Sequence, residues 1–232
     1  MANPYLTDRL PETLPSDPMH WVEAWIKDAQ EQDVARNPNA MAIVTANAEG
    51  APSVRMVLCK ALDADAGNLV FYTNYRSTKS REIDANTNVA ALFHWDALGR
   101  QVRIQGTAVR TPAAESDDYF ATRNWGSQLG AWGSDQSQPL ESRQALIKQV
   151  GKRALKMGVN VAKNLQSIIG DDQPVIERPP HWGGIRIWAR SVELWVEGKD
   201  RIHDRARWER ELVHTNDGDF ETGAWSGTRL QP

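Results

Sequence analysis

The sequence predicts a mainly β protein with flanking helices, of the α+β class, whose strands form an antiparallel barrel or sandwich. Short segments rich in β-branched and aromatic residues recur from residue 41 onward, separated by tight turns. That spacing is typical of antiparallel architectures and not of a parallel sheet. Residues 49–52, Glu-Gly-Ala-Pro, form a hairpin-type turn between two such segments.

The N-terminal part predicts an arm followed by a helix. Residues 1–14 are polar and contain prolines, and we expect a flexible arm that is disordered or loosely docked. Ser16 or Asp17 then caps a helix, with Pro18 in its first turn. Apolar residues at helical spacing should face the core: Met19, Val22, Ile26 and Ala29.

The remaining elements follow from periodicity and turn residues. We expect strands at 41–47, 53–58, 68–73, 89–95 and 101–109, and a short helix at 77–86. A helix at 112–123 should begin with Thr111 as its cap, and a longer one at 140–169 should break near Gly158. Loops at 170–174 and 179–180 precede two closing strands, 184–189 and 192–196.

Composition excludes several classes of protein. The 232 residues suffice for one sizeable core, and a net charge of −3 argues against a general nucleic-acid binder. The single cysteine excludes a disulfide framework, and the five histidines lack metal-ligand spacing, so we expect no metal. No apolar run approaches the roughly 20 residues of a membrane helix, and no signal peptide is recognisable. We therefore expect a cytoplasmic protein that binds neither nucleic acid nor membrane.

Arg201-Ile202-His203-Asp204-Arg205 is the most informative segment. In an extended chain Arg201, His203 and Arg205 project to one side, because side chains of a strand alternate. Three basic groups beside Trp195 suit a flat anionic ligand. The alternative is a strand edge that is charged to resist pairing.

Three further groups of residues could bind anions. Arg55 and Lys60 share one predicted strand but have opposite parity, so both reach one ligand only if a bulge or strand end intervenes. Hydroxyls and cations converge around the start of the helix at 77–86, where a phosphate could bind, in Tyr72, Thr73, Arg76, Thr78 and Lys79. The ordinary alternatives are a solvated strand face and a capped helix with surface charges.

The third group is spaced for one face of a helix. Tyr119, Arg123 and Ser127 lie four residues apart and would form an anion cradle if the helix continued to residue 127. An ordinary polar helix face is the alternative. Gln101, Gln136 and Ser137 are neutral hydrogen-bonding groups suited to the imide edge of a heterocycle.

No nucleophile or nucleotide-binding signature accompanies these cradles. The sequence lacks a P-loop, Gly-x-Gly-x-x-Gly, Gly-x-Ser-x-Gly and His-Glu-x-x-His. Anion sites without a nucleophile or metal suggest that a cofactor supplies the chemistry. Cys59, beside Lys60, is most simply a small apolar strand residue.

A series of ordered motifs resembles the pyridoxamine 5′-phosphate oxidase family. The similarity runs from about residue 15 to the C-terminus. The motifs are Arg55-Met-Val-Leu-Cys-Lys60, Phe71-Tyr-Thr-Asn74, Ser77-Thr-Lys79, Arg100-Gln-Val102, Tyr119-Phe120, Arg123, Ser127-Gln-Leu-Gly-Ala-Trp132, Gln136-Ser137, Trp182-Gly-Gly184, Trp195, Arg201-Ile-His-Asp-Arg205 and Arg229-Leu230-x-Pro232.

The resemblance implies an FMN-binding split β-barrel of antiparallel Greek-key type, as one domain over residues 15–232 that includes a C-terminal dimerisation region. It implies a homodimer with FMN at the subunit interface. The enzyme would oxidise pyridoxine or pyridoxamine 5′-phosphate to pyridoxal 5′-phosphate and reduce O2 to H2O2, with ammonia released from the amine.

The resemblance also assigns roles to residues. It implies that Lys60, Tyr119, Arg123 and Ser127 grip the substrate phosphate, while Arg201 and His203 lie over the pyridine ring as catalytic and substrate-binding residues. The residues expected to contact FMN are Arg55, Met56, Val57, Leu58, Lys60, Tyr72, Thr73, Thr78, Lys79, Gln101, Gln136, Ser137, Trp195 and Arg205.

Three departures from the family pattern are apparent, the first being that the N-terminal arm, residues 1–14, has no clear match in the family. An arginine is usual where Thr78 stands, and Arg76 could replace its contact with the FMN phosphate. Residues 138–180 form a segment about a dozen residues longer than usual. Two alternatives stay open: an FMN oxidase of another ring, such as a dihydrophenazine precursor, and a flavin-binding split barrel without turnover.

Overall fold

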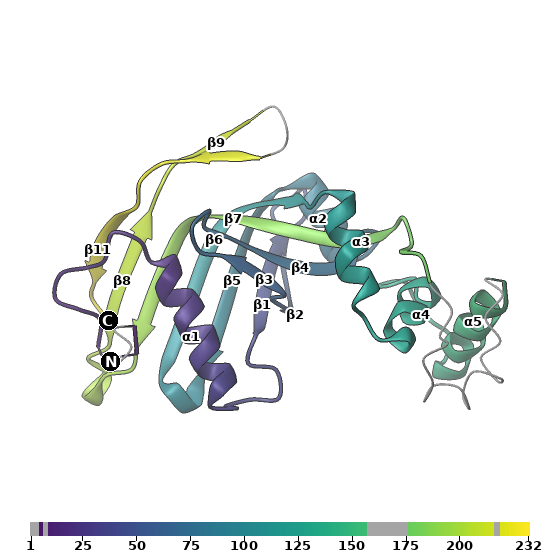
Figure 1. Ribbon diagram of the computed structural model, residues 1–232, viewed down its shortest axis with the longest axis horizontal. Coiled ribbons are helices and arrows are strands. Elements are labelled where there is room, and N and C mark those ends of the chain that lie inside the picture. Colours follow the sequence, from purple (N-terminus) through teal and green to yellow (C-terminus); the bar gives the residue numbers. More distant parts are fainter. Residues whose placement is uncertain (1–4, 7–8, 157–175, 216–218) are drawn as a thin grey trace. The chain divides into compact units, whose positions relative to one another are not determined.

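The structure, a computed structural model, describes residues 5–6, 9–156, 176–215 and 219–232 (Figure 1). Its α-helices are α1 (Met19–Glu31), α2 (Thr78–Ala85), α3 (Ala113–Ala121), α4 (Trp125–Gly133) and α5 (Arg143–Lys156). Its strands are β1 (Ala40–Ala46), β2 (Pro52–Leu58), β3 (Ala61–Asp63), β4 (Asn68–Asn74), β5 (Asn88–Trp95), β6 (Arg100–Arg110), β7 (Trp182–Val196), β8 (Asp204–Glu209), β9 (Leu212–His214), β10 (Phe220–Thr222) and β11 (Ser226–Leu230). Short 3-10 turns are η1 (Asp96–Leu98) and η2 (Lys199–Arg201).

One large sheet dominates the fold. Its strand order is β11-β8-β7-β6-β5-β1-β2, and β4 pairs with β3 and β7. The registers determined within this sheet are antiparallel, and β9 and β10 form a separate antiparallel hairpin. The predicted mainly β, antiparallel fold class with flanking helices is therefore confirmed.

The chain divides into two compact units. The sheet unit comprises residues 1–71, 82–109 and 185–232, and the helical unit comprises residues 72–81 and 110–184. The chain passes between them within β4 and α2, and again near the end of β6 and the start of β7. Each unit is described by itself, and the single domain at 15–232 stays a prediction.

One face of the sheet unit is buried and carries its core. Alternate residues of β1, β5 and β6 are buried, as the period of two requires. Helix α1 lies across this face (Figure 1) and buries Met19, Val22 and Trp25. Ile43 and Phe93 are fully buried sheet residues. The predicted apolar face of α1 is confirmed at Met19, Val22 and Ala29.

A buried ion pair anchors α1 to β6. Arg100 Nη1 lies 2.7 Å from Asp28 Oδ2, and both side chains are almost fully buried. The Arg100 guanidinium also lies over the Trp25 ring, 5.2 Å from its centroid. Removal of either charge would leave its partner buried and unpaired, which is strongly destabilising.

The segment before α1 contacts the C-terminal strands. The Leu10 N–H donates to Asp204 Oδ2 at 2.8 Å, and Arg229 Nη2 donates to the carbonyl of Pro11 at 2.6 Å. Trp208 Nε1 donates to the carbonyl of Pro15 at 2.7 Å. Helix α1 then begins at Met19, whose N–H donates to the Asp17 carboxylate at 2.7 Å.

The helical unit packs around its own apolar cluster. Phe120, Leu129, Ala154, Ile176 and Trp182 form this cluster together with Ala131. The buried Leu129 and Ala131 come from α4 and Ala154 comes from α5, so the amphipathic pattern of each helix determines the side that it buries.

Two sequence predictions about secondary structure are wrong, and four strands were missed. Strands 184–189 and 192–196 are one continuous strand, β7. The helix after Thr111 does not use that residue as cap: Thr111 Oγ1 lies 2.9 Å from the Ser116 hydroxyl instead. The predicted helix at 112–123 is confirmed as α3, but the condition for a single face through residue 127 is not met, because α3 ends at Ala121 and Asn124 caps α4. Strands β3, β9, β10 and β11 were not predicted.

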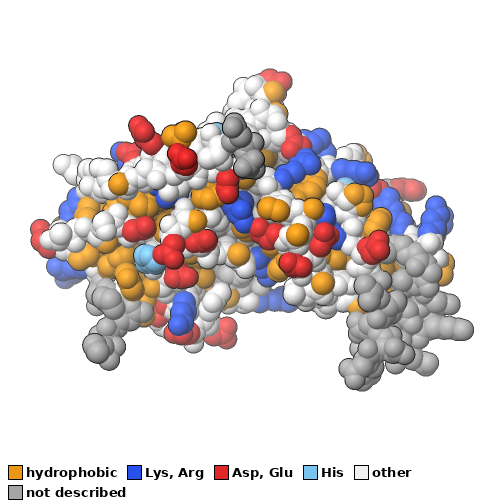
Figure 2. Space-filling view, turned by 45° about the horizontal axis from the view of Figure 1, so that its top comes forward, with side chains coloured by type: hydrophobic (Ala, Val, Ile, Leu, Met, Phe, Trp, Pro, Cys, Tyr) orange, Lys and Arg blue, Asp and Glu red, His pale blue; other side chains and the backbone are white. Residues whose placement is uncertain are grey.

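The predicted helix at 140–169 is confirmed only as α5, Arg143–Lys156. Its remainder, the break near Gly158 and the loop at 170–174 lie outside the described residues. No helix within the described ranges has the length and hydropathy needed to cross a membrane. Side chains of both charges are interspersed with apolar ones on the side of the molecule that Figure 2 shows.

Candidate functional site

The second face of the sheet in the sheet unit, here called the open face, carries several predicted flavin contacts. Met56 of β2 lies opposite Ala42, which in turn lies opposite Leu92. Gln101 of β6 is two residues from Arg103, the partner of Leu92, and so shares this face. Val54 and Met56 are 65% and 62% exposed, so the open face presents an uncovered apolar patch.

The open face continues across β7 and β8. Trp195 of β7 lies directly opposite Arg205 of β8. Glu193 lies on the same side of β7 as Trp195 and pairs with Arg103 of β6. Because Arg103 is on the open face, Glu193 and Trp195 are on the open face as well. The sheet therefore brings Met56, Gln101, Trp195 and Arg205 to a single face, as one flat ligand requires.

Glu193 is the buried anchor of this face. Its Oε1 accepts hydrogen bonds from Arg205 Nε at 3.1 Å and Arg205 Nη2 at 2.7 Å, while Oε2 pairs with Arg103. Arg205 Nη1 donates to the carbonyl of Gln231 at 3.0 Å. The Arg205 guanidinium is thus held from two sides in a fixed direction. Sequence reasoning missed Glu193, although a single charge in the apolar run Val192–Val196 was a readable signal.

Arg55 points away from the open face. Arg55, on β2, lies opposite Ile43 of β1 and donates to the Thr45 and Ser53 hydroxyls. Its Nη2 lies 3.2 Å from Glu82 Oε2, which also accepts from both hydroxyls. Burial alone raises the pKa of Glu82, but the hydrogen bonds from Thr45 and Ser53 and the charge of Arg55 outweigh it and lower that pKa.

Lys60 lies beyond the end of its predicted strand. Strand β2 ends at Leu58, and the exposed Lys60 follows in the link to β3, with its N–H donating to the carbonyl of Val70 at 2.8 Å. It lines a cavity of 620 Å³ together with His20 and Lys27 of α1. Because Lys60 lies outside the strand, the alternation of side chains within β2 does not force it to the opposite side from Arg55. Val57 and Leu58 are the last two residues of β2.

Cys59 is buried next to Lys60, as predicted for a small apolar residue. Burial raises the pKa of its thiol to about 12. The thiol therefore stays protonated at neutral pH and is a poor nucleophile.

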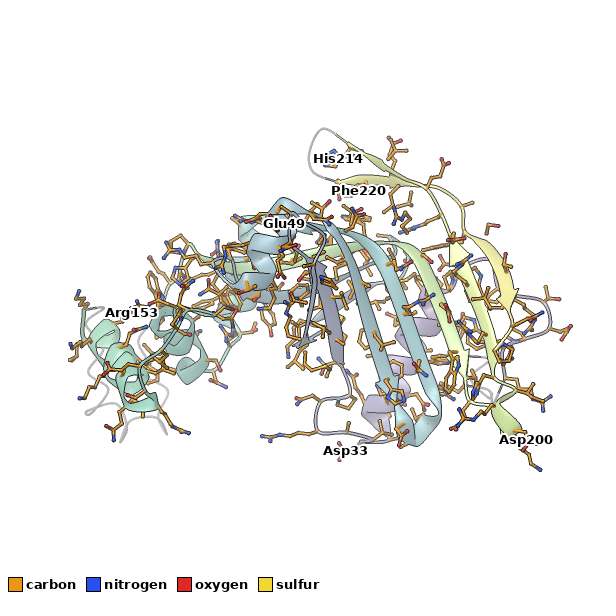
Figure 3. All side chains as sticks on the ribbon, turned by 180° about the vertical axis from the view of Figure 1, so that it is seen from behind. Asp33, Glu49, Arg153, Asp200, His214 and Phe220 are labelled. Carbon is orange, nitrogen blue, oxygen red and sulfur yellow. The ribbon has the colours of Figure 1, made fainter. Side chains whose placement is uncertain are left out.

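The basic segment 201–205 is not extended throughout, so the prediction of three basic side chains on one strand face is wrong. Arg201 ends η2 with a φ of 65°, after Asp200 with a φ of 56°. Strand β8 begins only at Asp204. Figure 3 shows Asp200 in the turn between β7 and β8. Arg201 is exposed at this turn, while Arg205 lies within the sheet.

His203 sits between that turn and the strand. Its imidazole centroid is 4.6 Å from the Trp195 ring, with 39° between the two planes. The Gly198 N–H donates to His203 Nδ1 at 3.2 Å. His203, Trp195 and Arg205 therefore lie together at one end of the open face.

In the helical unit, Lys79 is the centre of a polar cluster. This lysine is buried, and its Nζ donates to Thr73 Oγ1 at 3.0 Å, Ser77 Oγ at 3.3 Å and Gln136 Oε1 at 3.0 Å. Thr73 also donates to Gln136 at 3.2 Å. The structure thus brings together Thr73, Lys79 and Gln136 of the predicted flavin set.

Within the described ranges, no hydrogen bond joins Thr78 or Arg76 to this cluster. The Thr78 hydroxyl accepts from Arg81 Nη2 at 3.3 Å, and the Arg76 carbonyl accepts from Arg81 Nη1. Ser137 is exposed, with a φ of 70°. The proposed replacement of the family arginine by Arg76 stays a prediction.

Stacked aromatic rings form the cradle around Arg123. The Tyr72 and Tyr119 rings stack at 3.8 Å, and the Tyr72 ring lies 5.5 Å from that of Trp182. The Arg123 guanidinium lies over the Trp182 ring, 4.5 Å from its centroid. Arg123 Nη1 is buried and has no hydrogen-bond partner among the residues that the structure describes. Burial lowers the pKa of Arg123, while nearby Tyr119 raises it less.

A buried cationic nitrogen without a partner is costly unless a ligand satisfies it. Ser127 lies close in sequence, in the first turn of α4, where its N–H donates to the Asn124 side chain at 2.9 Å. The three predicted residues do not share one helix face. Tyr119 lies in α3, Arg123 lies between the two helices, and Ser127 lies in α4. Sequence reasoning placed Trp182 in a family motif but assigned it no role in the site, where its ring lies against both Tyr72 and Arg123.

The predicted sets are divided between the two units. Lys60, Arg201 and His203 belong to the sheet unit, whereas Tyr119, Arg123 and Ser127 belong to the helical unit. The described residues contain no group of histidine, cysteine and carboxylate side chains that could hold a metal ion.

Comparison with known proteins identifies a family. Residues 27–155 match the family model described as pyridoxamine 5′-phosphate oxidase, and residues 182–232 match the pyridoxine 5′-phosphate oxidase C-terminal dimerisation region. A pyridoxine/pyridoxamine 5′-phosphate oxidase of Roseobacter denitrificans is 40% identical over 98% of this chain and 100% of its own. One from Caulobacter vibrioides is 41% identical over 93% of this chain and 85% of its own.

Solved structures agree with this similarity. PhzG from Burkholderia lata, in complex with tetrahydrophenazine-1-carboxylic acid, has a TM-score of 0.76 and 29% identity over 94% of both chains. A pyridoxamine 5′-phosphate oxidase-related protein of Nostoc punctiforme, with a TM-score of 0.63 and 14% identity over 91% of this chain and 97% of its own, shares the fold. The predicted split-barrel fold is confirmed, and the chain belongs to the pyridoxamine 5′-phosphate oxidase family.

Proposed function

We propose that this protein is an FMN-dependent oxidase that converts pyridoxine 5′-phosphate and pyridoxamine 5′-phosphate to pyridoxal 5′-phosphate. The observation that carries the proposal is the similarity over nearly the whole chain to relatives that bear this name. The oxidation consumes one O2 and yields one H2O2, and the amine substrate also consumes water and releases ammonia.

The residues present fit FMN. Lys79 is a buried lysine whose Nζ donates to Thr73, Ser77 and Gln136. It suits a phosphate, because a hydrogen bond from an ammonium to a charged acceptor is stronger than one to a neutral oxygen. On the open face, Met56 and Trp195 offer apolar surface, and Gln101 and Arg205 offer donors, as the ring of a flavin requires. Arg55, Val57, Leu58, Tyr72, Thr78 and Ser137 complete the proposed set.

When bound, FMN would accept the hydride that leaves the 4′ carbon of the substrate and pass electrons to O2. The protein binds and orients the substrate. The phosphate is remote from the reacting carbon, so its binding energy can be used to hold the ring in a reactive position.

Arg123 is the main candidate for gripping that phosphate. Within the described part of the chain its buried Nη1 lacks a hydrogen-bond partner, and its guanidinium lies over the Trp182 ring. A phosphate oxygen would satisfy this donor with a charge-assisted hydrogen bond, contributing on the order of 1.5–3 kcal/mol. We assign Lys60, Tyr119 and Ser127 to the same phosphate.

Arg201 and His203 are assigned to the substrate ring. Arg201 is an exposed guanidinium at the turn before β8, and His203 is held against Trp195, one of the proposed flavin contacts. A guanidinium near the ring can stabilise charge that develops during hydride transfer.

We further propose that the open face is covered by a second copy of the chain. Val54, Met56 and Leu92 leave an apolar patch exposed on a sheet face. Exposed contiguous apolar surface marks interaction sites. The matched dimerisation region, residues 182–232, contributes β7, β8 and β11 to the same sheet. A homodimer would therefore bury the patch and enclose the proposed flavin contacts.

A second candidate function is the oxidation of an unphosphorylated ring. The similarity to PhzG, solved with tetrahydrophenazine-1-carboxylic acid, favours it. The Arg123 cradle argues against it, because a ring without phosphate would leave Arg123 Nη1 unsatisfied.

Oxygen consumption with three substrates separates these functions. We expect turnover of pyridoxine 5′-phosphate that exceeds turnover of unphosphorylated pyridoxine and of a dihydrophenazine carboxylic acid. Preference for either unphosphorylated ring would overturn the proposal, and binding without turnover of any substrate would indicate a flavin-binding protein.

A further inference from the structure

The ring of His203 is held at one nitrogen by the backbone. The Gly198 N–H donates to His203 Nδ1 at 3.2 Å. An imidazole nitrogen that accepts a hydrogen bond carries no proton, so the single proton of the neutral ring is on Nε2. The partner of one ring nitrogen therefore determines what the other nitrogen can do.

The position of Gly198 depends on its lack of a side chain. A Cβ at residue 198 would lie 1.7 Å from the carbonyl oxygen of Ile202 and 2.5 Å from its carbonyl carbon. The backbone of Gly198 is extended, with a φ of −118° and a ψ of 150°, so the requirement is for space and not for an unusual conformation. Only glycine lets the chain before η2 approach the residues after it this closely.

The Trp195 ring restricts the plane of the imidazole. The ring centroids are 4.6 Å apart, and the planes are inclined by 39°. His203 is half-buried, and within the described ranges no hydrogen bond to its Nε2 is found. Nδ1 is thus engaged by the backbone, while Nε2 is available to a ligand.

We propose that Gly198 is a positioning residue that fixes His203 as the neutral Nε2–H tautomer, so that His203 serves as a hydrogen-bond donor to the substrate. This inference rests on the proposed function, because it places His203 beside the substrate ring. The acceptor it suits is an oxygen on that ring, such as the ring hydroxyl in its ionised form. In this state Nε2 cannot take a proton, so His203 is not the base of the reaction.

The tautomer can be observed directly, whatever the substrate. In the holoprotein labelled with 15N-histidine, we expect a pyridine-like shift for Nδ1 of His203 and a pyrrole-like shift for Nε2. The spectrum of His203→Gln identifies the signals among the five histidines. The reverse pattern, or averaging of the two shifts, would overturn the inference even if the enzyme oxidises pyridoxine 5′-phosphate.

Two substitutions test the donor role. Glutamine can place an amide N–H where Nε2 stands, whereas the asparagine amide reaches only the position of Nδ1. We expect His203→Gln to keep kcat/KM within about tenfold of the parent and His203→Asn to lose about 100-fold. Equal losses, or the better performance of His203→Asn, would contradict the donor role.

Turnover by the parent protein, measured beside the NMR spectrum, separates this inference from the proposed function. Lack of turnover by the parent protein would refute the function and leave the NMR result standing. Gly198→Ala is not used, because its Cβ has no room and would disrupt the turn itself.

Discussion

Glu193 and Arg205 form a two-point ion pair across β7 and β8, in which Nε and Nη2 of the arginine donate to one carboxylate oxygen at 3.1 and 2.7 Å. The same carboxylate pairs with Arg103. One buried carboxylate thus holds two arginines on the open face, and one of them is a proposed flavin contact.

Glu193→Gln should weaken flavin binding. The amide keeps the size of the side chain but loses the charge, so Arg205 loses its fixed direction and the two arginines repel one another. We expect the Kd of FMN for the apoprotein to rise about tenfold, the equivalent of about 1.4 kcal/mol. Titration of the apoprotein, followed by quenching of flavin fluorescence, measures it. Glu209→Gln is the matched control, because Glu209 is an exposed carboxylate that pairs with another arginine of β8, Arg207. Equal affinities of Glu193→Gln and the control would contradict the role of Glu193.

Glu82→Gln should reduce stability above acidic pH. The pKa of Glu82 is lowered from its usual 4.5 in the folded state, because hydrogen bonds and Arg55 outweigh burial. A lowered folded pKa adds stability above pH 4.5, and this stability is lost as the pH falls through the folded value. We expect the variant to lose about 1–3 kcal/mol at pH 7.

Urea denaturation at several pH values checks the sign. The difference between parent and variant should shrink as the pH falls below 4.5. A difference that grows on acidification would show that Glu82 is not stabilised as a carboxylate.

Arg123→Ala should impair binding of the phosphorylated substrate. It removes the proposed phosphate contact, and we expect KM for pyridoxine 5′-phosphate to rise about 10- to 100-fold, with a smaller change in kcat. Steady-state oxygen consumption measures both constants. Arg143→Ala, an exposed arginine at the start of α5, is the control. An unchanged KM would remove Arg123 from the substrate site.

Val54→Glu should dissociate the dimer. A carboxylate within the apolar patch would be buried without a partner when the second copy binds. We expect a monomer by light scattering after size exclusion, together with loss of bound flavin. Val213→Glu is the control, because it places the same charge on β9 at a valine of similar exposure, 57% against 65% for Val54. We expect this control to stay dimeric. If Val54→Glu stays dimeric, the second copy binds elsewhere.

The sequence predicted the strands that alternate between buried and exposed residues. Strands β1, β5 and β6 follow this period, and the turn at 49–52 marks the β1–β2 hairpin. The prediction divided strand β7 at Arg190 and Ser191. In the structure Arg190 accepts a backbone hydrogen bond from Arg210, and Ser191 pairs with Glu209, so tertiary pairing continues the strand through both residues.

The residues of the site were easier to predict than their arrangement. The split between α3 and α4 was readable, since Asn124 is a preferred N-cap residue. The left-handed backbone of Arg201 was not, because no intrinsic preference of arginine favours a positive φ. The pairing of Glu193 with two arginines depends on strand register, which periodicity alone does not give.

The most direct test of the account is an anaerobic mixture of the purified holoprotein with pyridoxine 5′-phosphate, followed by the visible absorbance of the flavin and then by admission of air. We expect the flavin absorbance to bleach, and to recover in air as H2O2 and pyridoxal 5′-phosphate appear. A flavin that stays oxidised in the presence of substrate would contradict the proposed oxidase.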